Sequence, residues 1–301
     1  MKWRKLGLMF DPSNRFDWML SHATNPTIDR LSDNISRVYF ASRDISNCSQ
    51  VGYFEFDINN PFQILSVSKR PVLELGTLGA FDDSGVFPSW IITDQKIKYL
   101  YYIGWSRGVT VPFYAFIGLA ISEDEGKSFR RISSSPIVGR NEIDHYFLTS
   151  PCVIHEKGKW RMWYASGVKW EKIKNDVKHY YHIKYGESSD GVHWNSLGII
   201  CIDFKDATEY AICRPFVIFE DNIYKMWYCY RGNYYKLGYA ESEDGLKWDR
   251  KDDRVGIDIS KEGWDSEMIC YPAILEYQQK KYMLYNGNDY GKTGIGLAVL
   301  D

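Results

Sequence analysis

Acidic and histidine residues gather shortly ahead of prolines that are spaced almost evenly along the 301-residue chain. A carboxylic acid can protonate a leaving oxygen and a carboxylate can activate water, so these groups are candidates for acid and base chemistry. The candidate catalytic residues are Asp82, Asp83, Asp144, His145, Glu209 and Glu267. Residues so far apart in sequence can act together only if the fold brings the prolines to a common centre.

A second set of polar and aromatic residues lies beside the same prolines or just after the tyrosine-rich runs that follow them. These candidate ligand-binding residues are His22, Asn25, Arg43, Asp44, Trp105, Arg107, Arg214, Tyr230, Arg231 and Asp289. An arginine can hold a carboxylate or a phosphate through two parallel hydrogen bonds, so several arginines near one centre would favour an anionic ligand. The alternative for aspartates such as Asp265 is a turn-forming role, in which they bond only to the backbone.

An internal repeat explains the even spacing. The prolines are Pro26, Pro88, Pro151, Pro215 and Pro272, separated by 62, 63, 64 and 57 residues, and a tyrosine stands 13 residues after each of them. Around these anchors, short apolar and aromatic runs alternate with Asp/Gly turns, which is typical of antiparallel strands. A period near 60 residues with about four strands per unit is typical of propeller blades.

The repeat therefore predicts an all-β fold: a single five-bladed β-propeller domain, residues 1–301, with four antiparallel strands per blade. The predicted blades lie near 11–75, 76–138, 139–202, 203–258 and 259–301, the last completed by residues 1–10. The reason is that the final unit stops after its third strand, while WRKLGLM near the N-terminus copies the outer-strand sequence WNSLGII of the third unit. An N-terminal strand in that place would cover edges that are otherwise exposed.

The longest insertion, residues 168–182, separates the second and third strands of the third unit and is basic and aromatic. We expect it to be a solvated loop. The alternative is a lid or wall over one mouth of a central funnel.

Composition limits the class of partner. The chain has 37 Lys+Arg against 39 Asp+Glu, which argues against a dedicated nucleic-acid or membrane-surface protein. Aromatic residues make up 16% of the chain, and their flat faces suit both strand packing and sugar rings. The six cysteines show no CxxC spacing, and neither a secretory signal nor a membrane-spanning run is evident, so we expect a cytoplasmic protein with reduced thiols and no membrane insertion.

The units resemble the five-bladed propeller superfamily of glycoside hydrolases, which includes families 43, 32, 68, 62, 117 and 130. The resemblance rests on the runs FDDSGVFPSWI and KYLYYIG and on repeats such as KLGYAESEDGLKW. It implies a carbohydrate substrate in an axial funnel, and it leaves room for an axial calcium or sodium ion that no residue pattern demands; no other cofactor is expected. The turns SEDEGKSF, SSDGVHW and SEDGLKW also resemble sialidase Asp boxes, which implies structural turns on the outer blade edges.

The departures from these families concern the catalytic positions. Family 43 enzymes place a catalytic Asp directly before the first-blade proline, where this chain has Asn25, and an amide cannot act as a base at neutral pH. The later Glu of families 43 and 32 is also missing, because Thr149 and Cys213 occupy the position two residues before the proline. The Arg-Asp-Pro triplet of family 32 is absent, and the resemblance to family 117, whose members are thought to use a histidine as acid, draws attention to His145.

The preferred function is a carbohydrate-active enzyme of glycoside hydrolase type, inverting if it hydrolyses. Glu209 or His145 would be its acid, and Asp82, Asp83 or Asp144 its base. Two rival functions remain: a non-catalytic sugar-binding propeller, and a cytoplasmic enzyme of glycan assembly that transfers or phosphorolyses a sugar. A funnel without two carboxyl groups within about 10 Å of each other would exclude direct acid/base hydrolysis.

Overall fold

The computed structural model describes residues 1–174 and 176–301, and almost all of its regular structure is β-strand. Its helical segments are two short ones, the 3-10 turn η1 (Asp252–Arg254) and the single turn α1 (Asn288–Gly291). The strands, in chain order, are β1 (Trp3–Phe10), β2 (Ser21–Arg30), β3 (Ile35–Arg43), β4 (Ser49–Asp57), β5 (Ile64–Val67), β6 (Gly85–Asp94), β7 (Ile97–Arg107), β8 (Phe113–Ser122), β9 (Arg130–Arg131), β10 (Leu148–Glu156), β11 (Lys159–Ile173), β12 (Asp176–Ser188), β13 (Trp194–Ile202), β14 (Ala211–Glu220), β15 (Ile223–Arg231), β16 (Tyr235–Ser242), β17 (Asp249–Arg250), β18 (Cys270–Tyr277), β19 (Lys280–Asn286) and β20 (Ile295–Leu300).

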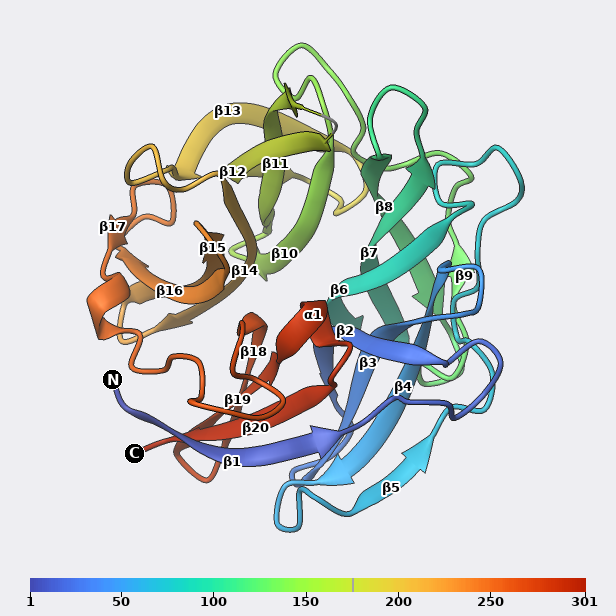
Figure 1. The fold of residues 1–301 in the computed structure, drawn as a ribbon, viewed down its shortest axis with the longest axis vertical. Coiled ribbons are helices and arrows are strands. Elements are labelled where there is room, and N and C mark those ends of the chain that lie inside the picture. Colours follow the sequence, from blue (N-terminus) through green and yellow to red (C-terminus); the bar gives the residue numbers. More distant parts are fainter. Residues whose placement is uncertain (175) are drawn as a thin grey trace.

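Successive strands pair antiparallel and form repeated units, β2 to β5, β6 to β9, β10 to β13 and β14 to β17. The last unit has the order β18, β19, β20, β1, because β1 pairs antiparallel with β20 from Trp3 opposite Leu300 to Phe10 opposite Ile295. Residues 3–10 therefore lie beside the last strand, as the copied outer-strand sequence predicts. The units surround a common centre, and both chain ends lie in the same unit (Figure 1).

Neighbouring units are joined mainly by side-chain packing. The only parallel strand pairs in the described part of the chain are single-residue contacts, Ser49 with Gly85 and Tyr181 with Ala211. Apolar clusters fill the interfaces: one packs Phe54 against Leu284 between the first and last units, and another packs Leu119 against Val153 between the second and third. Similar clusters join the first and second, third and fourth, and fourth and last units, so burial closes the ring.

Glycine turns on the outer edges add a directional contact between units. The Tyr39 hydroxyl donates to the Gly126 carbonyl at 2.9 Å, Tyr101 to Gly191 at 2.9 Å, and the Trp163 indole to Gly245 at 2.8 Å. The three glycines belong to the turns that resemble Asp boxes, and in each turn a serine hydroxyl accepts the glycine N–H at 2.8 or 2.9 Å. These turns therefore have a packing role between neighbouring units.

Gly126→Ala should lower the free energy of unfolding by about 3 kcal/mol, because it combines an unfavourable backbone with a steric clash. Gly126 has φ +80°, and an added Cβ would lie 2.0 Å from the Tyr39 hydroxyl. The matched control is Gly158→Ala, where φ is +73° and nothing lies within 4 Å. The control should lose only about 1 kcal/mol in urea unfolding. Equal losses in the two variants would refute the packing role of the Gly126 turn.

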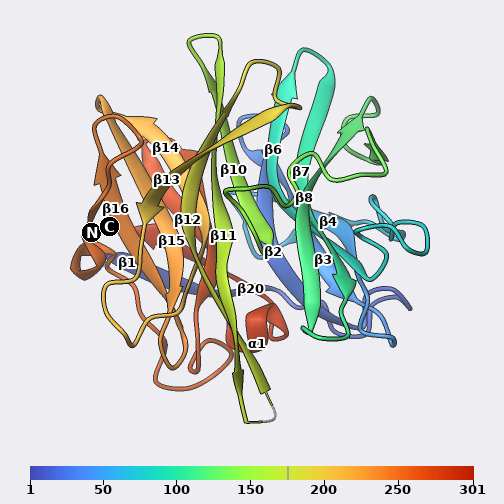
Figure 2. The same ribbon diagram turned by 90° about the horizontal axis from the view of Figure 1, so that it is seen from above.

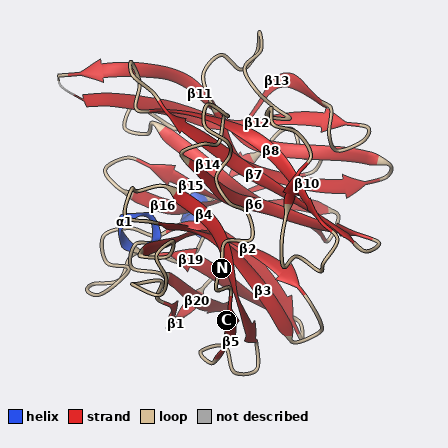
Figure 3. Ribbon diagram, turned by 90° about the vertical axis from the view of Figure 1, so that its right-hand side faces the viewer, coloured by secondary structure: helices blue, strands red, loops and turns tan. Residues whose placement is uncertain are grey.

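The insertion at 168–182 is not a solvated loop in the part that the structure describes; Asn175 lies outside that part. Strands β11 and β12 continue through it as an extended antiparallel hairpin, which projects beyond the ring on the same side as α1 (Figures 2 and 3). Trp170 lies opposite His179 in this hairpin, and the Trp170 ring lies 5.1 Å from Phe113 and 5.2 Å from Phe147. These apolar contacts hold the hairpin as a wall, the alternative interpretation of the sequence. Among the described residues, no helix is both long and apolar enough to cross a bilayer.

Candidate functional site

A cavity of about 350 Å³ lies at the centre, and side chains from all five units line it. Its residues are Thr24, Asn25, Arg43, Phe87, Ile103, Trp105, Pro112, Phe113, Ala115, Phe147, Thr149, Ser150, His179, Tyr181, Cys213, Arg231, Tyr235, Tyr271 and Tyr290. The walls are mainly aromatic, with two guanidinium groups and several hydroxyls among them. This composition, an apolar lining with a few polar groups, is typical of small-molecule sites.

Four of the predicted binding residues line this cavity: Asn25, Arg43, Trp105 and Arg231. Asn25 has φ +60° and its side-chain oxygen is buried without a hydrogen-bond partner. An unpartnered buried acceptor is unfavourable unless a ligand supplies a donor. The position directly before the first repeated proline therefore holds an amide whose oxygen is free to accept a hydrogen bond from a ligand.

The other predicted binding residues lie outside the cavity lining. Asp44 accepts the N–H groups of Ser46 and Cys48 within its own turn, and Arg107 donates to the Ser46 carbonyl. Tyr230 lies against the Arg250 guanidinium, at 5.5 Å from its ring centroid. These contacts are local packing and turn contacts.

Arg214 is fully buried and holds three units together. Its guanidinium donates to the Pro26 carbonyl in β2 and to the Ser89 carbonyl in β6, while its own backbone belongs to β14. Burial lowers the pKa of Arg214 to about 10, so the group stays charged at neutral pH. Arg214 therefore acts as a structural crosslink below the cavity lining.

Two histidines sit at or beside the cavity in a neutral state. Burial, followed by the charge of Arg43, lowers the pKa of His22 to about 4, although Asp289 opposes the shift. Burial, followed by the charge of Arg231, lowers the pKa of His179 to about 4. His22 and Asp289 do not line the cavity, but Arg43, which does, acts on His22, and the charge of Asp289 acts on Arg43.

Stability should fall as the pH falls from 6.5 towards 4. The unfolded chain binds a proton on each histidine near pH 6.5, whereas the folded chain resists protonation of His22 and His179 until about pH 4. We expect each histidine to cost about 1 kcal/mol at pH 5, after allowing for partial solvent exposure. The measurement is the urea midpoint at pH 7.5 and pH 5, with His22→Gln/His179→Gln as the comparison. A midpoint drop that is the same in the double variant would contradict this assignment.

The aspartates before the prolines are held by tyrosines on neighbouring strands. The Tyr102 hydroxyl donates to Asp82 at 3.0 Å, Tyr164 to Asp144 at 2.8 Å, and Tyr285 to Asp265 at 2.9 Å. Each of these carboxylates also pairs with a cation, which is Arg131 at 2.7 Å, Lys184 at 3.0 Å or Lys5 at 2.7 Å, respectively. The same chemistry recurs in the fourth unit, where Asp252 contacts Tyr228 and Arg250.

Asp144 shows why such a carboxylate stays charged. It is fully buried, which opposes ionisation, but hydrogen bonds from Ser166 and Tyr164 and the charge of Lys184 outweigh burial and hold the pKa of Asp144 below its usual range. A general base with a depressed pKa and every oxygen occupied is poorly suited to take up a proton. The geometry gives Asp144 a structural role.

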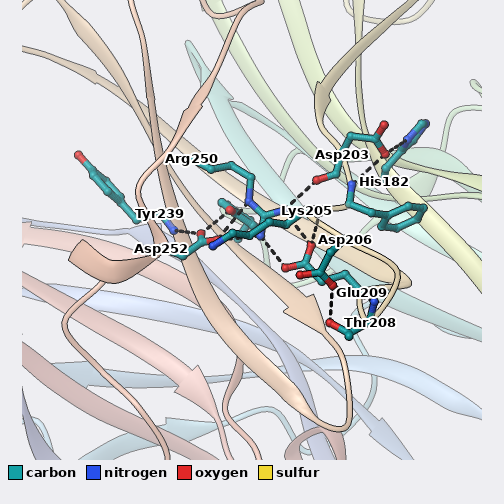
Figure 4. A network of polar contacts seen from close by, with 11 residues as sticks. His182, Asp203, Lys205, Asp206, Thr208, Glu209, Tyr239, Arg250 and Asp252 are labelled. Carbon is teal, nitrogen blue, oxygen red and sulfur yellow. Dashed lines mark hydrogen bonds and ion pairs between the residues drawn. The ribbon is translucent and has the colours of Figure 1, made fainter.

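Glu209 belongs to a second polar network, away from the cavity lining. Arg250 binds it through two nitrogens, at 2.8 and 3.0 Å, and also binds Asp252 at 2.7 Å (Figure 4). The Lys205 N–H donates to the same carboxylate at 2.9 Å. A bidentate pair of this kind fixes the loop before β14.

The three remaining catalytic candidates lie near the surface. The Asp83 carboxylate accepts hydrogen bonds from the Gly79 N–H and the Ser84 hydroxyl, and His145 contacts the Glu142 carbonyl at 2.8 Å. Glu267 is exposed. None of the six catalytic candidates lines the cavity, and no Asp or Glu of the described residues does so. The described side chains likewise contain no group of three or more His, Cys, Asp or Glu placed to hold a metal ion.

Much of the lining was missed by the sequence analysis. Tyr271 stands directly before Pro272, the position that Asn25, Phe87 and Ser150 occupy in other units, and all four residues line the cavity. Tyr235 begins β16, Tyr290 lies in α1 and His179 lies in the insertion. The signal that could have found His179 is the aromatic content of the insertion, since a solvated loop does not need Trp170 beside it. The signal that could have found Tyr271 is its place directly before the repeated proline, whereas Tyr235 and Tyr290 carried no signal beyond the abundance of tyrosine.

Comparison with known structures gives the class of fold. The chain has a TM-score of 0.74 and 16% identity with a structure named only as a glycoside hydrolase, covering 98% of this chain and 90% of the other. For a thermostable family-43 glycoside hydrolase the TM-score is 0.67 at 16% identity, with coverage of 95% and 91%. A structure from work on the GH130 family of mannoside phosphorylases gives 0.72 at 17% identity, with coverage of 99% and 93%. The fold is that of the five-bladed propeller glycoside hydrolases, and likeness at this identity shows the fold alone.

Comparison with curated sequences gives the family. The chain is 42% identical over 301 residues to the uncharacterized protein Rv1502 of Mycobacterium tuberculosis strain H37Rv, and all of both chains is covered. The uncharacterized protein MT1551 of strain CDC 1551 matches equally. The chain belongs to the family of these mycobacterial proteins. No model of a known protein family matches the sequence.

Proposed function

We propose that this protein binds a carbohydrate in its central cavity and does not hydrolyse it by a pair of carboxyl groups. The observation that carries the proposal is the lining itself: aromatic rings and hydrogen-bonding groups converge from all five units, and no carboxylate of the described residues is among them. Both retaining and inverting hydrolysis in most families need two carboxyl groups flanking the scissile bond. The preferred expectation from sequence therefore gives way to the sugar-binding alternative.

The finer architecture belongs to the same proposal. We take the units as the blades of one propeller domain, residues 1–301, near 11–75, 76–138, 139–202, 203–258 and 259–301 plus 1–10. The antiparallel strand order within each unit and the apolar clusters between units support these blades. The cavity then lies on the propeller axis, where each blade presents the start of its inner strand.

The aromatic walls give the proposal its chemistry. Sugar rings carry C–H faces that pack on aromatic rings, while their hydroxyls need donors and acceptors at the ring edge. Trp105 has its indole N–H fixed by the Ser49 hydroxyl at 2.9 Å, so its ring is held in place beside the cavity. Asn25 supplies the unpartnered acceptor.

The test is calorimetric titration with a panel of neutral and acidic mono- and disaccharides, together with a chromogenic glycoside panel. Trp105→Ala should weaken the binding of the best ligand about 5- to 150-fold, since it removes an aromatic contact worth about 1 to 3 kcal/mol. Phe62→Ala is the control, because Phe62 is 47% exposed and does not line the cavity. Glycoside turnover that is lost in folded Glu267→Gln or His145→Gln would overturn the non-hydrolytic proposal.

A further inference from the structure

The arginines of this protein fall into two groups. Outside the cavity, four buried or partly buried guanidinium groups each pair with a carboxylate at 2.6 to 2.8 Å, and the fully buried Arg214 donates to backbone carbonyls and hydroxyls instead. The four ion pairs are Arg37 with Glu55, Arg131 with Asp82, Arg161 with Glu156, and Arg250 with Glu209. In the cavity, Arg43 and Arg231 have no carboxylate within ion-pair distance among the described residues. Burying a charge is costly unless it is paired or fully hydrogen-bonded, and the two cavity arginines have neither a carboxylate nor the set of backbone acceptors that Arg214 has.

Arg231 is built into the wall. Its Nη1 donates to the Tyr290 hydroxyl at 2.7 Å, and its guanidinium carbon lies 5.4 Å from the ring centroids of Tyr210 and Tyr235. Its Nε is buried and has no hydrogen-bond partner. The aromatic faces stabilise the positive charge but accept no strong hydrogen bonds, so donors remain for a ligand.

Arg43 lines the same cavity as Tyr290, and Tyr290 and Asp289 are close enough to act on its charge. Its Nη1 donates to the Asn47 side chain at 3.1 Å, and burial lowers the pKa of Arg43, although the group remains a cation at neutral pH. The carboxylate whose charge acts on Arg43 is Asp289, whose side chain is 63% exposed and pairs with Lys292 at 3.5 Å. Asp289 therefore does not neutralise the cavity.

The segment between the two arginines has an unusual backbone. Asp289 and Tyr290 have φ of +56° and +59°, a left-handed conformation that non-glycine residues seldom adopt. The Thr24 hydroxyl holds this segment by donating to the Tyr290 carbonyl at 2.9 Å. Strain of this kind is maintained where the surrounding structure fixes it, and here it places the Tyr290 hydroxyl against Arg231.

We propose that the cavity takes a saccharide that carries an anionic group, a carboxylate or a phosphate, and that the oxygens of this group accept hydrogen bonds from Arg43 and Arg231. The inference rests on the proposed function and adds the class of ligand. The aromatic walls hold the sugar ring, and the ligand's negative charge supplies the counter-charge that the protein does not. A volume of about 350 Å³ suits a mono- or disaccharide.

The test begins with probes that do not depend on the identity of the sugar. Inorganic phosphate and sulfate, each at tens of millimolar and constant ionic strength, should raise the melting temperature of the wild type. The shift should be lost in Arg43→Gln and Arg231→Gln. Arg107→Gln is the charge-matched control and should keep the shift, because Arg107 is exposed and lies outside the cavity. Circular dichroism of each variant without anion shows whether it is folded.

The second arm compares uronic acids, sugar phosphates and the matching neutral sugars by calorimetry. Arg231→Gln should weaken an acidic sugar 10- to 100-fold and a neutral sugar less than threefold, because only the charged hydrogen bonds are lost. Asp289→Asn should tighten the binding of acidic sugars two- to fivefold, because it removes a negative charge that acts on Arg43. Glucuronate and glucose 6-phosphate distinguish a carboxylate from a phosphate ligand.

The outcomes separate the two proposals. In the first outcome, neutral sugars bind, but the affinity for acidic sugars and the melting-temperature shift by inorganic anions are the same in the wild type and in the Arg43 and Arg231 variants. The proposal of an anionic ligand is then wrong, and the proposal of sugar binding stands. If inorganic phosphate binds as tightly as every sugar phosphate and no sugar of the panel binds, the cavity is an anion site and sugar binding fails. If the wild type responds to no anion and binds no acidic sugar, the inference is overturned.

Discussion

Replacing Arg214 with methionine should lower the free energy of unfolding by about 4 kcal/mol. The side chain is fully buried, and it donates to the Pro26 carbonyl at 2.8 Å and to the Thr27 hydroxyl at 3.2 Å as well as to Ser89. Methionine fills part of the volume but leaves two buried carbonyls without a donor, each costing about 1 to 3 kcal/mol. Replacing a buried ion by an apolar side chain leaves stability unchanged only when its polar partners are replaced too. The main partners of Arg214 are backbone carbonyls, which no substitution removes.

The measurement is urea unfolding of the wild type, Arg214→Met and Arg214→Lys. The lysine variant keeps the charge and some of the hydrogen bonds, so it should lie between the other two and provides a folded protein if methionine does not. Arg107→Met is the control for loss of an arginine, since Arg107 is exposed. A methionine variant as stable as the wild type would show that Arg214 is not a crosslink.

Asp144→Asn should cost about 3 to 4 kcal/mol, because it leaves the Lys184 ammonium in a buried site without its counter-ion. The Tyr164 and Ser166 hydroxyls lose a charged acceptor in the same change, at 2.8 and 2.7 Å. Asp83→Asn is the matched control. Asp83 is only partly buried and has no ion pair among the described residues, so its loss should stay below about 1 kcal/mol.

This pair of variants also separates a structural from a catalytic Asp144. Urea unfolding reports the stability, and the same samples are titrated with the best saccharide below the unfolding transition. A structural residue predicts a large stability loss with sugar affinity changed less than threefold. An Asp144→Asn variant with wild-type stability would contradict the role that the geometry gives it.

The repeat could be predicted from sequence because strand pairing demands alternating runs and turns in every unit. The prolines and the copied outer-strand pattern were sufficient to predict the pairing of β1 with β20. The exact register could not be predicted in the same way. In the first unit the residue after the proline, Thr27, pairs with the repeated tyrosine, Tyr39, whereas in the third unit the corresponding Cys152 pairs with Trp163.

The aspartates illustrate a signal that was present but not used. Asp82 and Tyr102, Asp144 and Tyr164, and Asp265 and Tyr285 are each separated by 20 residues in the chain. An acid and a hydroxyl that recur at a constant spacing indicate a structural hydrogen bond that is repeated in each unit. A catalytic pair would occur only once in the chain. The cavity could be predicted only in part. Arg43 and Arg231 were expected from the ends of the tyrosine-rich runs, whereas His179, Tyr235 and Tyr290 come from positions where the units differ.

The pairing of β1 with β20 has a consequence for how the protein is made. Arg4 and Asp301 form an ion pair across 297 residues of sequence, and β1 finds its only strand partner in β20 within the described structure. During synthesis, β1 leaves the ribosome before the other strands of the ring, and its edge stays unpaired until β20 has been made. The ring can therefore close only after β20 has left the ribosome, and the unpaired edge of β1 is the point at which a chaperone or another nascent chain can bind before then.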